Sequence, residues 1–332
     1  MRVIWIGFGA VVVASVAAAL VAFPGGPAKA APTGTGLALV AYSTPKDAYG
    51  KIIPAFNGTA AGKDVSFSQS YGGSTEQAAA VAAGQPADVV ALSLAPDVTS
   101  LVNHGLVAKN WAKNRYHGMV TDSIVVFVVR DGNPKKIHGW ADLVKPGIQV
   151  ITSNPVTSGG ARWNIMAGYG AQLNQGKTKA QARAYLKRLI QHVPAFPDSA
   201  RTALATFAAG KGDVLITYEN EAIYANRKGV HTSFVRPRQT LLVENPVAVT
   251  KSGAKKPAAR AFVRFLVTPQ AQRLYAEQGF RPVVRKVLRQ TAYPNPKQLF
   301  TIGYLGGWPK VQKQFFAPKT GIVTRIIAAN GK

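Results

Sequence analysis

Short apolar stretches alternate with helically spaced ones along most of the chain. The first predicted strands are 37–42, 65–69 and 88–92, and the helices that follow them are 45–56, 74–83 and 98–104. In the first of these helices Tyr49, Ile52, Ile53 and Phe56 stand at positions i, i+3, i+4 and i+7, which is the spacing of one helix face. Regular alternation of this kind predicts an α/β fold with a mostly parallel sheet.

Two longer apolar strands, 122–130 and 241–250, bracket a middle region that has its own strand and helix pattern. The predicted elements of this region are strands 148–151 and 214–217 and helices 161–169, 180–192 and 203–209. A domain inserted between two crossing strands gives two lobes joined by a hinge, with a cleft between them. Clefts between domains are preferred sites for small ligands.

The chain has 332 residues, enough for two domains. We expect a discontinuous lobe 1 formed by 37–121 and 247–332, and a lobe 2 formed by 122–246. Two helices, 255–266 and 269–278, and the C-terminal tail would complete lobe 1.

The N-terminus has the pattern of an export signal. Met1 and Arg2 precede an apolar run over 3–23, a Pro/Gly break follows, and the small-residue triplet ends at Ala30. We interpret 1–30 as a cleaved signal peptide. The alternative is an uncleaved anchor, because the apolar run approaches the length of a membrane span.

Charge and cysteine content limit the classes of function that the chain can have. The formal charge is +26, and it is +24 without residues 1–30, which contain Arg2 and Lys29 and no acid. This balance indicates an anionic partner, but the bases are dispersed and export argues against nucleic acid. The chain contains no cysteine, which excludes disulfides, thiolate catalysis and cysteine-ligated zinc.

Four segments place hydroxyl-bearing or small residues where a predicted helix begins. They are 43–44, 69–77, 154–164 and 198–201. Ser74 and Gln77 form a capping-box pattern, while Gly159 and Gly160 would present bare backbone N–H groups. A helix N-terminus attracts anions, although any one of these starts taken alone is better explained as an ordinary cap. Since they follow strands on both expected lobes, we favour convergence on one anion.

Catalytic and nucleotide-binding patterns are absent from the sequence. The histidines show no metal-ligand spacing, and neither a G-x-S-x-G elbow nor a glycine-rich nucleotide loop is present. Glu219 and Glu221, expected at positions i and i+2 of a strand, are either an acid pair or structural. We predict no enzyme activity, no metal and no cofactor.

At these helix starts the chain resembles the bacterial sulfate-binding proteins of ABC importers. The matching stretches are SFSQSYGGSTEQA, NPVTSGGARWN, GDVLITYENEA, GWADLVKP and FTIGYLGGWPKVQKQFF. The resemblance extends in the same order over nearly all of the chain after 30. It implies a type II periplasmic-binding-protein fold, an extracytoplasmic location such as the periplasm, and a membrane permease as partner. We expect a monomer that binds no nucleic acid.

The resemblance also implies a ligand site of uncharged donors. Ser74 would donate its hydroxyl, and Ser158 its hydroxyl and its backbone N–H. The other implied residues, by matching position, are Gly159, Gly160 and Ala200 as backbone donors, Ser43 ahead of the first helix, and Tyr218.

Three positions depart from the family pattern. Tyr218 stands where these proteins usually have a tryptophan, Val156 replaces a lysine that is not a ligand, and the segment AYSTPKD lacks the usual Tyr-Asp-Pro. A tyrosine hydroxyl can accept a hydrogen bond as well as donate one, so Tyr218 leaves open which oxyanion the site prefers. Besides sulfate or thiosulfate, the open alternatives are molybdate, tungstate or phosphate, and, outside the binding class, an exported serine hydrolase or a cationic envelope protein.

Overall fold

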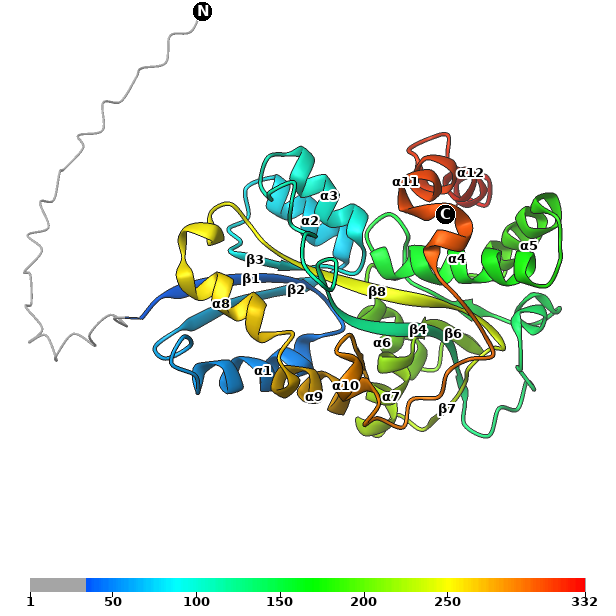
Figure 1. The fold of residues 1–332 in the computed structure, drawn as a ribbon. Helices are drawn as coiled ribbons and strands as arrows, with labels where there is room; N and C mark the ends of the chain where they lie inside the picture. The colour runs from blue at the N-terminus through cyan, green and yellow to red at the C-terminus, as the bar shows by residue number, and fades with distance from the viewer. Residues whose placement is uncertain (1–33, 332) are drawn as a thin grey trace, which may run out of the picture. The chain divides into compact units, whose positions relative to one another are not determined.

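Two long antiparallel strands, β4 (Met119–Arg130) and β8 (Gln239–Val249), run through the centre of the fold (Figure 1). The last residues of β8 pair with β3 (Val89–Ala91), and its first residues pair with β10 (Gln298–Phe300). The second half of β4 pairs with β6 (Val214–Tyr218). The two expected crossing strands are therefore confirmed, and each joins one half of the sheet to the other.

β4 carries an unbroken apolar run because both of its faces are buried. Val125, Phe127 and Val129 pack into the main core, whereas Val126 and Val128 pack on the opposite face, against α6 (Ala200–Ala208) and α7 (Glu219–Arg227). A strand covered on both sides is expected to be continuously hydrophobic rather than alternating.

The computed structural model describes residues 34–331, which fall in one compact unit, so the predicted signal segment 1–30 lies outside the described residues. The first half of the sheet is parallel, as predicted, in the order β2-β1-β3. Its remaining strands are β1 (Gly36–Tyr42) and β2 (Ser66–Gly72), and its helices are α1 (Lys46–Asn57), α2 (Ser74–Ala82) and α3 (Ala95–Asn103). α3 begins earlier than the predicted 98 because Pro96 occupies its first turn.

The second half of the sheet has the order β4-β6-β5, with β7 on the other side of β4. Its elements are the 3-10 helix Trp140–Val144, β5 (Val150–Ile151), α4 (Gly159–Asn174), α5 (Lys179–Gln191), α6 (Ala200–Ala208), α7 (Glu219–Arg227) and β7 (Thr232–Val235). The expectation that Glu219 and Glu221 share a strand is wrong, because β6 ends at Tyr218 and α7 begins at the next residue.

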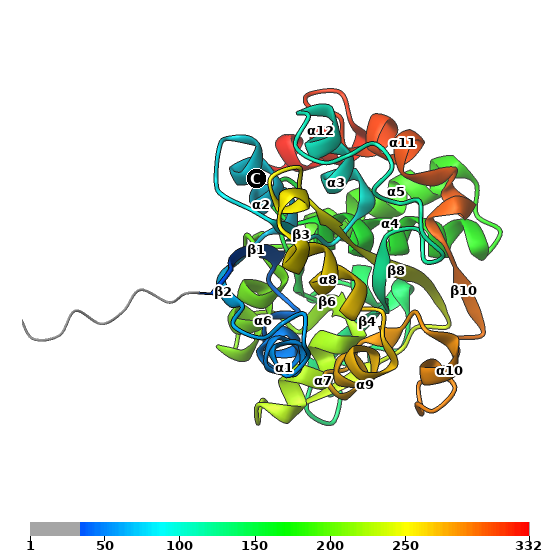
Figure 2. The same ribbon diagram turned by 60° about the vertical axis from the view of Figure 1, so that its left-hand side comes forward.

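The segment after β8 contacts both halves. Its elements are the 3-10 helix Gly253–Lys255, α8 (Pro257–Phe265), α9 (Pro269–Glu277), β9 (Arg281–Pro282), α10 (Arg285–Leu288), the 3-10 helix Ile302–Leu305, α11 (Gly307–Val311), the π-helix Gln312–Phe316 and α12 (Ile322–Ala329). α9 lies beside α1 (Figure 2), whereas α12 packs on α5 and α11 touches α3. In the tail Trp308 stacks edge-on against Trp163 of α4 at 4.6 Å. The expected boundaries of lobe 1 and lobe 2 remain a prediction.

A pair of acidic residues on the crossing strands makes stability depend on pH. Asp122 of β4 lies directly opposite Glu244 of β8. Burial, together with Glu244, raises the pKa of Asp122 to about 7 against the opposing effect of Arg281. The folded state then binds more protons than the unfolded state between about pH 4 and about pH 7, so stability falls as pH rises through this window.

We therefore expect Asp122→Asn to raise the free energy of unfolding at pH 8, by on the order of 1 kcal/mol, and the gain to shrink toward pH 4. Urea unfolding at several pH values measures this, with Asp131→Asn as the control, because Asp131 is an exposed acid in the turn directly after β4. A gain that is the same at every pH would contradict the assignment.

Candidate functional site

Three of the four predicted helix starts follow strands: α1 follows β1, α2 follows β2, and α4 follows β5 after a short loop. The fourth, α6, follows helix α5 and is capped by Ser199, whose hydroxyl accepts a hydrogen bond from the Thr202 N–H. The side chains at these starts are buried, with Ser74 and Ser158 only 2% and 3% exposed. Buried polar groups at several helix starts indicate a built polar site rather than surface caps.

The starts of α2, α4 and α6 meet in space. The N–H of Glu76 donates to the Thr157 carbonyl at 3.0 Å, and the Thr157 hydroxyl donates to the Asp198 carbonyl at 2.8 Å. A Cβ on Gly73 would lie 2.5 Å from the Thr157 oxygen and 2.8 Å from the Asp198 oxygen. Glycine is thus required here by close backbone approach.

The Ser74 hydroxyl is already engaged within the protein. It donates to Asp97 at 2.5 Å and accepts from the Ser93 N–H at 2.8 Å. The Thr75 hydroxyl occupies the other oxygen of Asp97 at 3.0 Å. Burial raises the pKa of Asp97, although Arg162 and the two hydroxyls oppose the shift. What Ser74 leaves available is its backbone N–H.

Ser158 has the complementary arrangement. Its backbone N–H donates to the Asn154 carbonyl at 2.8 Å, so that group is committed to the loop. Its hydroxyl accepts from Ser153 at 3.1 Å, which leaves the Ser158 hydroxyl proton free to donate. Within residues 34–331, the N–H groups of Gly159, Gly160 and Ala200 have no protein acceptor, as expected for first-turn positions.

Tyr218 lies beside the start of α4. A Cβ on Gly160 would be 3.4 Å from the Tyr218 hydroxyl, which forms a 2.7 Å hydrogen bond with the Ser93 hydroxyl. Burial, reinforced more weakly by Tyr42 and Asp97, raises the Tyr218 pKa well above its usual value. The hydroxyl therefore keeps its proton at neutral pH and can donate it.

Two further hydroxyls belong to this region: Thr44, which lies in the predicted segment 43–44, and Tyr42, which was not predicted. The hydroxyls of Tyr42 and Thr44 are buried and have no hydrogen-bond partner among the described residues. They flank Ser43, whose own hydroxyl accepts from the Arg201 N–H at 3.4 Å. An unpaired buried hydroxyl is costly, so these groups suit a site that receives a polar ligand.

Arg201, in the first turn of α6, is neutralised locally. Arg201 contacts Glu221 at 3.0 Å and Asp47 at 3.1 Å, and its guanidinium also donates to the Thr44 carbonyl. Asp47 belongs to α1 and Glu221 to α7, so Arg201 fastens the two halves together. Despite partial burial, the hydrogen bond and charge of Arg201 lower the pKa of Asp47. The groups left to face a ligand are neutral donors.

Ser93 links the site and was not predicted either. Besides its bonds to Ser74 and Tyr218, its carbonyl accepts from the Trp163 indole at 2.8 Å and from Asn245 at 3.0 Å. Trp163 of α4, the indole donor, is fully buried. The one available signal was that Ser93 follows a buried strand, as the other site residues do.

Fold and site together define a two-lobed binding protein whose lobes meet at the beginnings of helices. A family profile for bacterial extracellular solute-binding proteins matches residues 37–281. The periplasmic binding protein AfuA from Actinobacillus pleuropneumoniae has the same fold, at a TM-score of 0.63 and 20% identity, over 89% of this chain and 97% of that one. No helix among the described residues is long and apolar enough to cross a membrane.

Closer relatives identify the group. A sulfate-binding protein of Synechocystis is 39% identical over 93% of this chain and 91% of its own length. A thiosulfate-binding protein of Pseudomonas aeruginosa is 34% identical over 88% of this chain and 92% of its own. The solved sulfate-binding protein SubI from Mycobacterium tuberculosis is 44% identical, with a TM-score of 0.83, over 85% of this chain and 99% of that one. The chain belongs to the family of bacterial extracellular solute-binding proteins, in the group that contains the sulfate-binding proteins, which confirms the resemblance.

Proposed function

We propose that the protein is exported, captures sulfate or the related dianion thiosulfate, and delivers it to the permease of an ABC importer. The observation that carries this proposal is the convergence of neutral donors from the starts of α2, α4 and α6. Relatives named for sulfate and thiosulfate support the same two ligands.

The donor set that we propose differs in detail from the one implied by the resemblance. The backbone N–H of Ser74, rather than its hydroxyl, would face the ligand, because the hydroxyl is held by Asp97. The hydroxyl of Ser158 would donate, while its N–H stays with Asn154. The remaining donors are the N–H groups of Gly159, Gly160 and Ala200 and the hydroxyl of Tyr218, with Ser43 at the edge of the site.

Such a set selects a fully ionised dianion. Sulfate accepts hydrogen bonds and donates none at neutral pH, so a site of donors satisfies it completely. Protonated phosphate brings an O–H that needs an acceptor, and both oxygens of Asp97 are occupied by hydroxyls. An unpaired buried group costs about 1–3 kcal/mol, which corresponds to about fivefold to about 150-fold discrimination for each such group.

Binding and release without chemical change fit this arrangement. The Ser158 hydroxyl, which a serine hydrolase would use as its nucleophile, is bonded to Ser153 and not to a histidine or carboxylate. We propose a monomer with 1–30 as a signal peptide, lobe 1 formed by 37–121 and 247–332, and lobe 2 by 122–246. Lobe closure would bury the anion and present a distinct surface to the permease.

Calorimetric titration of residues 31–332 with sulfate, thiosulfate, molybdate and phosphate tests the proposal. We expect binding of sulfate or thiosulfate at least about a hundredfold tighter than of phosphate. If molybdate bound most tightly, the protein would be a molybdate-binding protein instead. If no oxyanion bound and the protein hydrolysed an ester in a reaction that Ser158→Ala abolished, an exported hydrolase would be favoured.

Tyr218→Phe isolates the one aromatic donor. We expect it to weaken sulfate binding about tenfold to a hundredfold, because a hydrogen bond to a charged group contributes about 1.5–3 kcal/mol. Titration of the variant measures this, with Tyr304→Phe as the matched change at a half-exposed tyrosine. Unchanged affinity would remove Tyr218 from the site.

A further inference from the structure

One face of the molecule carries exposed cations and no acid. We define it as α5, the loop before it, and the tail from α11 to α12. Its exposed cations are Lys177, Lys179, Arg183, Lys187, Arg188, Lys310, Lys313, Lys319 and Arg325. None of the 14 acidic residues of the chain lies in 143–197 or 278–332. α12 packs on α5, so the elements that carry these cations are neighbours in the fold (Figure 1).

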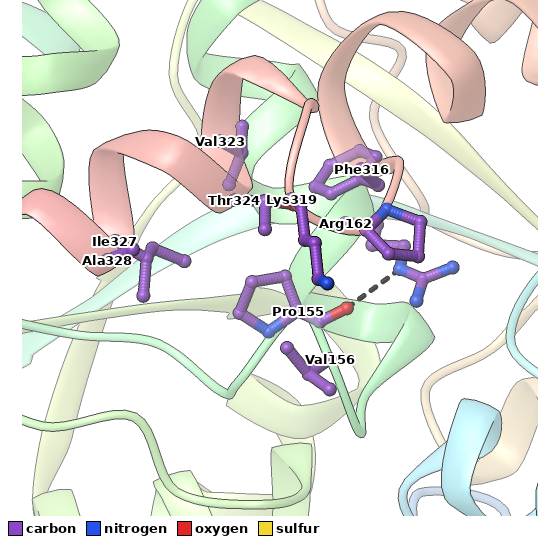
Figure 3. A pocket seen from close by; sticks show the side chains of 10 residues that line it. Pro155, Val156, Arg162, Phe316, Lys319, Val323, Thr324, Ile327 and Ala328 are labelled. Carbon is purple, nitrogen blue, oxygen red and sulfur yellow. Dashed lines mark hydrogen bonds between the residues drawn. The ribbon is translucent and has the colours of Figure 1, made fainter.

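The same face contains an apolar cavity of about 410 Å³ between α12 and the loop before α4 (Figure 3). Val156, Phe316, Val323 and Ile327 line it. Val156 is 66% exposed, which is high for a side chain of its type. An open apolar cavity beside exposed apolar residues marks a surface that interacts with something.

Two cations, Arg162 and Lys319, stand at this cavity, and Arg162 also interacts electrostatically with the buried Asp97. The Nε of Arg162 donates to the Pro155 carbonyl at 2.8 Å, and its terminal nitrogens have no acceptor among the described residues. Lys319 forms no ion pair with any residue of 34–331. The cavity thus offers apolar walls and positive donors together, which fits a molecule that has an apolar part and an anionic part.

We propose that this face, called here the tail face, docks on an anionic phospholipid surface. Head-group phosphates would contact the exposed cations, and acyl carbons would enter the cavity at Val156 and Ile327. Charge complementarity selects an anionic partner, and the apolar cavity favours a lipid surface over a soluble polyanion. Such docking would hold a solute-binding protein close to a permease in the same membrane. This benefit rests on the proposed function, whereas the contact between the tail face and the membrane does not.

Vesicle co-sedimentation of residues 31–332 tests the proposal without the apolar N-terminal segment. With about 30 mol% phosphatidylglycerol in phosphatidylcholine, we expect at least tenfold stronger partitioning than on phosphatidylcholine alone. Because the attraction is screened, about 0.5 M NaCl should remove most of the binding. Equal partitioning on both vesicle types, or binding to heparin without binding to vesicles, would overturn the proposal.

Matched charge reversals separate the face from the net charge. The triple variant Lys187→Glu, Lys319→Glu and Arg325→Glu should lose about a hundredfold in partitioning, at about fivefold for each cation. The control Lys255→Glu, Arg260→Glu and Arg264→Glu changes the net charge equally on and beside α8 and should lose less than about threefold. An equal loss of vesicle partitioning in the two triple variants would contradict the proposal that the tail face is the membrane-binding surface.

The apolar contact and the folded state need their own measurements. Ile327→Ser should weaken vesicle binding several-fold at low salt, whereas adsorption by charge alone would leave it unchanged and so refute insertion into the cavity. Sulfate titration of each variant is run in parallel. Intact sulfate affinity with lost vesicle binding supports the tail face, and vesicle binding by a protein that takes no sulfate would refute only the proposed function.

Discussion

Gly73→Ala is expected to weaken sulfate binding by about a hundredfold while leaving the ligand-free fold intact. The added Cβ would lie 2.5 Å from the Thr157 oxygen and 2.8 Å from the Asp198 oxygen. Both obstacles are backbone atoms, which cannot turn aside as a flexible side chain can. Overpacking of this kind costs about 1–3 kcal/mol, and a loss of about 2.7 kcal/mol is a hundredfold in affinity.

The effect should fall on closure rather than on folding. Gly73 has φ −63° and ψ 133°, an extended conformation that alanine adopts freely. Its neighbours Thr157 and Asp198 precede α4 and α6, in the expected lobe 2, so an open arrangement would relieve the contact. The variant would therefore fold normally, but its two lobes would not close fully over the ligand.

Calorimetry with sulfate and thermal unfolding without ligand distinguish these effects. Gly50→Ala is the control, because a Cβ there meets no atom within 4 Å. We expect the control to keep its affinity and both proteins to keep the ligand-free Tm within a few degrees. Wild-type affinity in Gly73→Ala would show that α2 and α4 do not meet in the bound state.

The helix starts were predictable from sequence because their signals are local. Two glycines before Ser74 and two after Ser158 mark a tight approach and a bare helix start, whatever the rest of the fold does. The crossing strands were predictable for a similar reason, since burial of β4 on both faces requires a continuous apolar run.

The hydrogen-bond assignments within the site were not predictable. That the Ser74 hydroxyl belongs to Asp97 depends on a contact between α2 and α3, and no sequence pattern reports such a tertiary contact. The roles of Ser93 and of the unpaired Tyr42 hydroxyl depend in the same way on packing around Tyr218.

Glu219 and Glu221 were wrongly predicted to lie on a strand because β6 passes into α7 without a loop. Tyr218 is the last strand residue and also the N-cap, so no turn residue separates the two elements. The structure places Glu219 in the first turn of α7, where a carboxylate is favoured by the helix dipole. Its role is structural.

Glu219→Ala is expected to lower the free energy of unfolding by about 3–5 kcal/mol. The Glu219 carboxylate is completely buried and binds two guanidinium groups, Arg281 at 2.7 Å and Arg236 at 2.5 Å. Truncation would leave Arg281, which is 4% exposed, without its only ion-pair partner among residues 34–331. An uncompensated buried charge costs far more than the pair itself contributes.

Urea unfolding of three variants tests this account. Glu277→Gln, which breaks an exposed pair with Lys51 at 3.7 Å, should change the unfolding free energy by less than about 1 kcal/mol. The double variant Glu219→Ala with Arg281→Met should recover part of the loss, because it removes the orphaned charge and refills the volume with an apolar side chain. If the double variant were less stable than Glu219→Ala alone, the penalty would come from lost packing or from the Arg281 contact with the Pro294 carbonyl, and not from an unpaired charge.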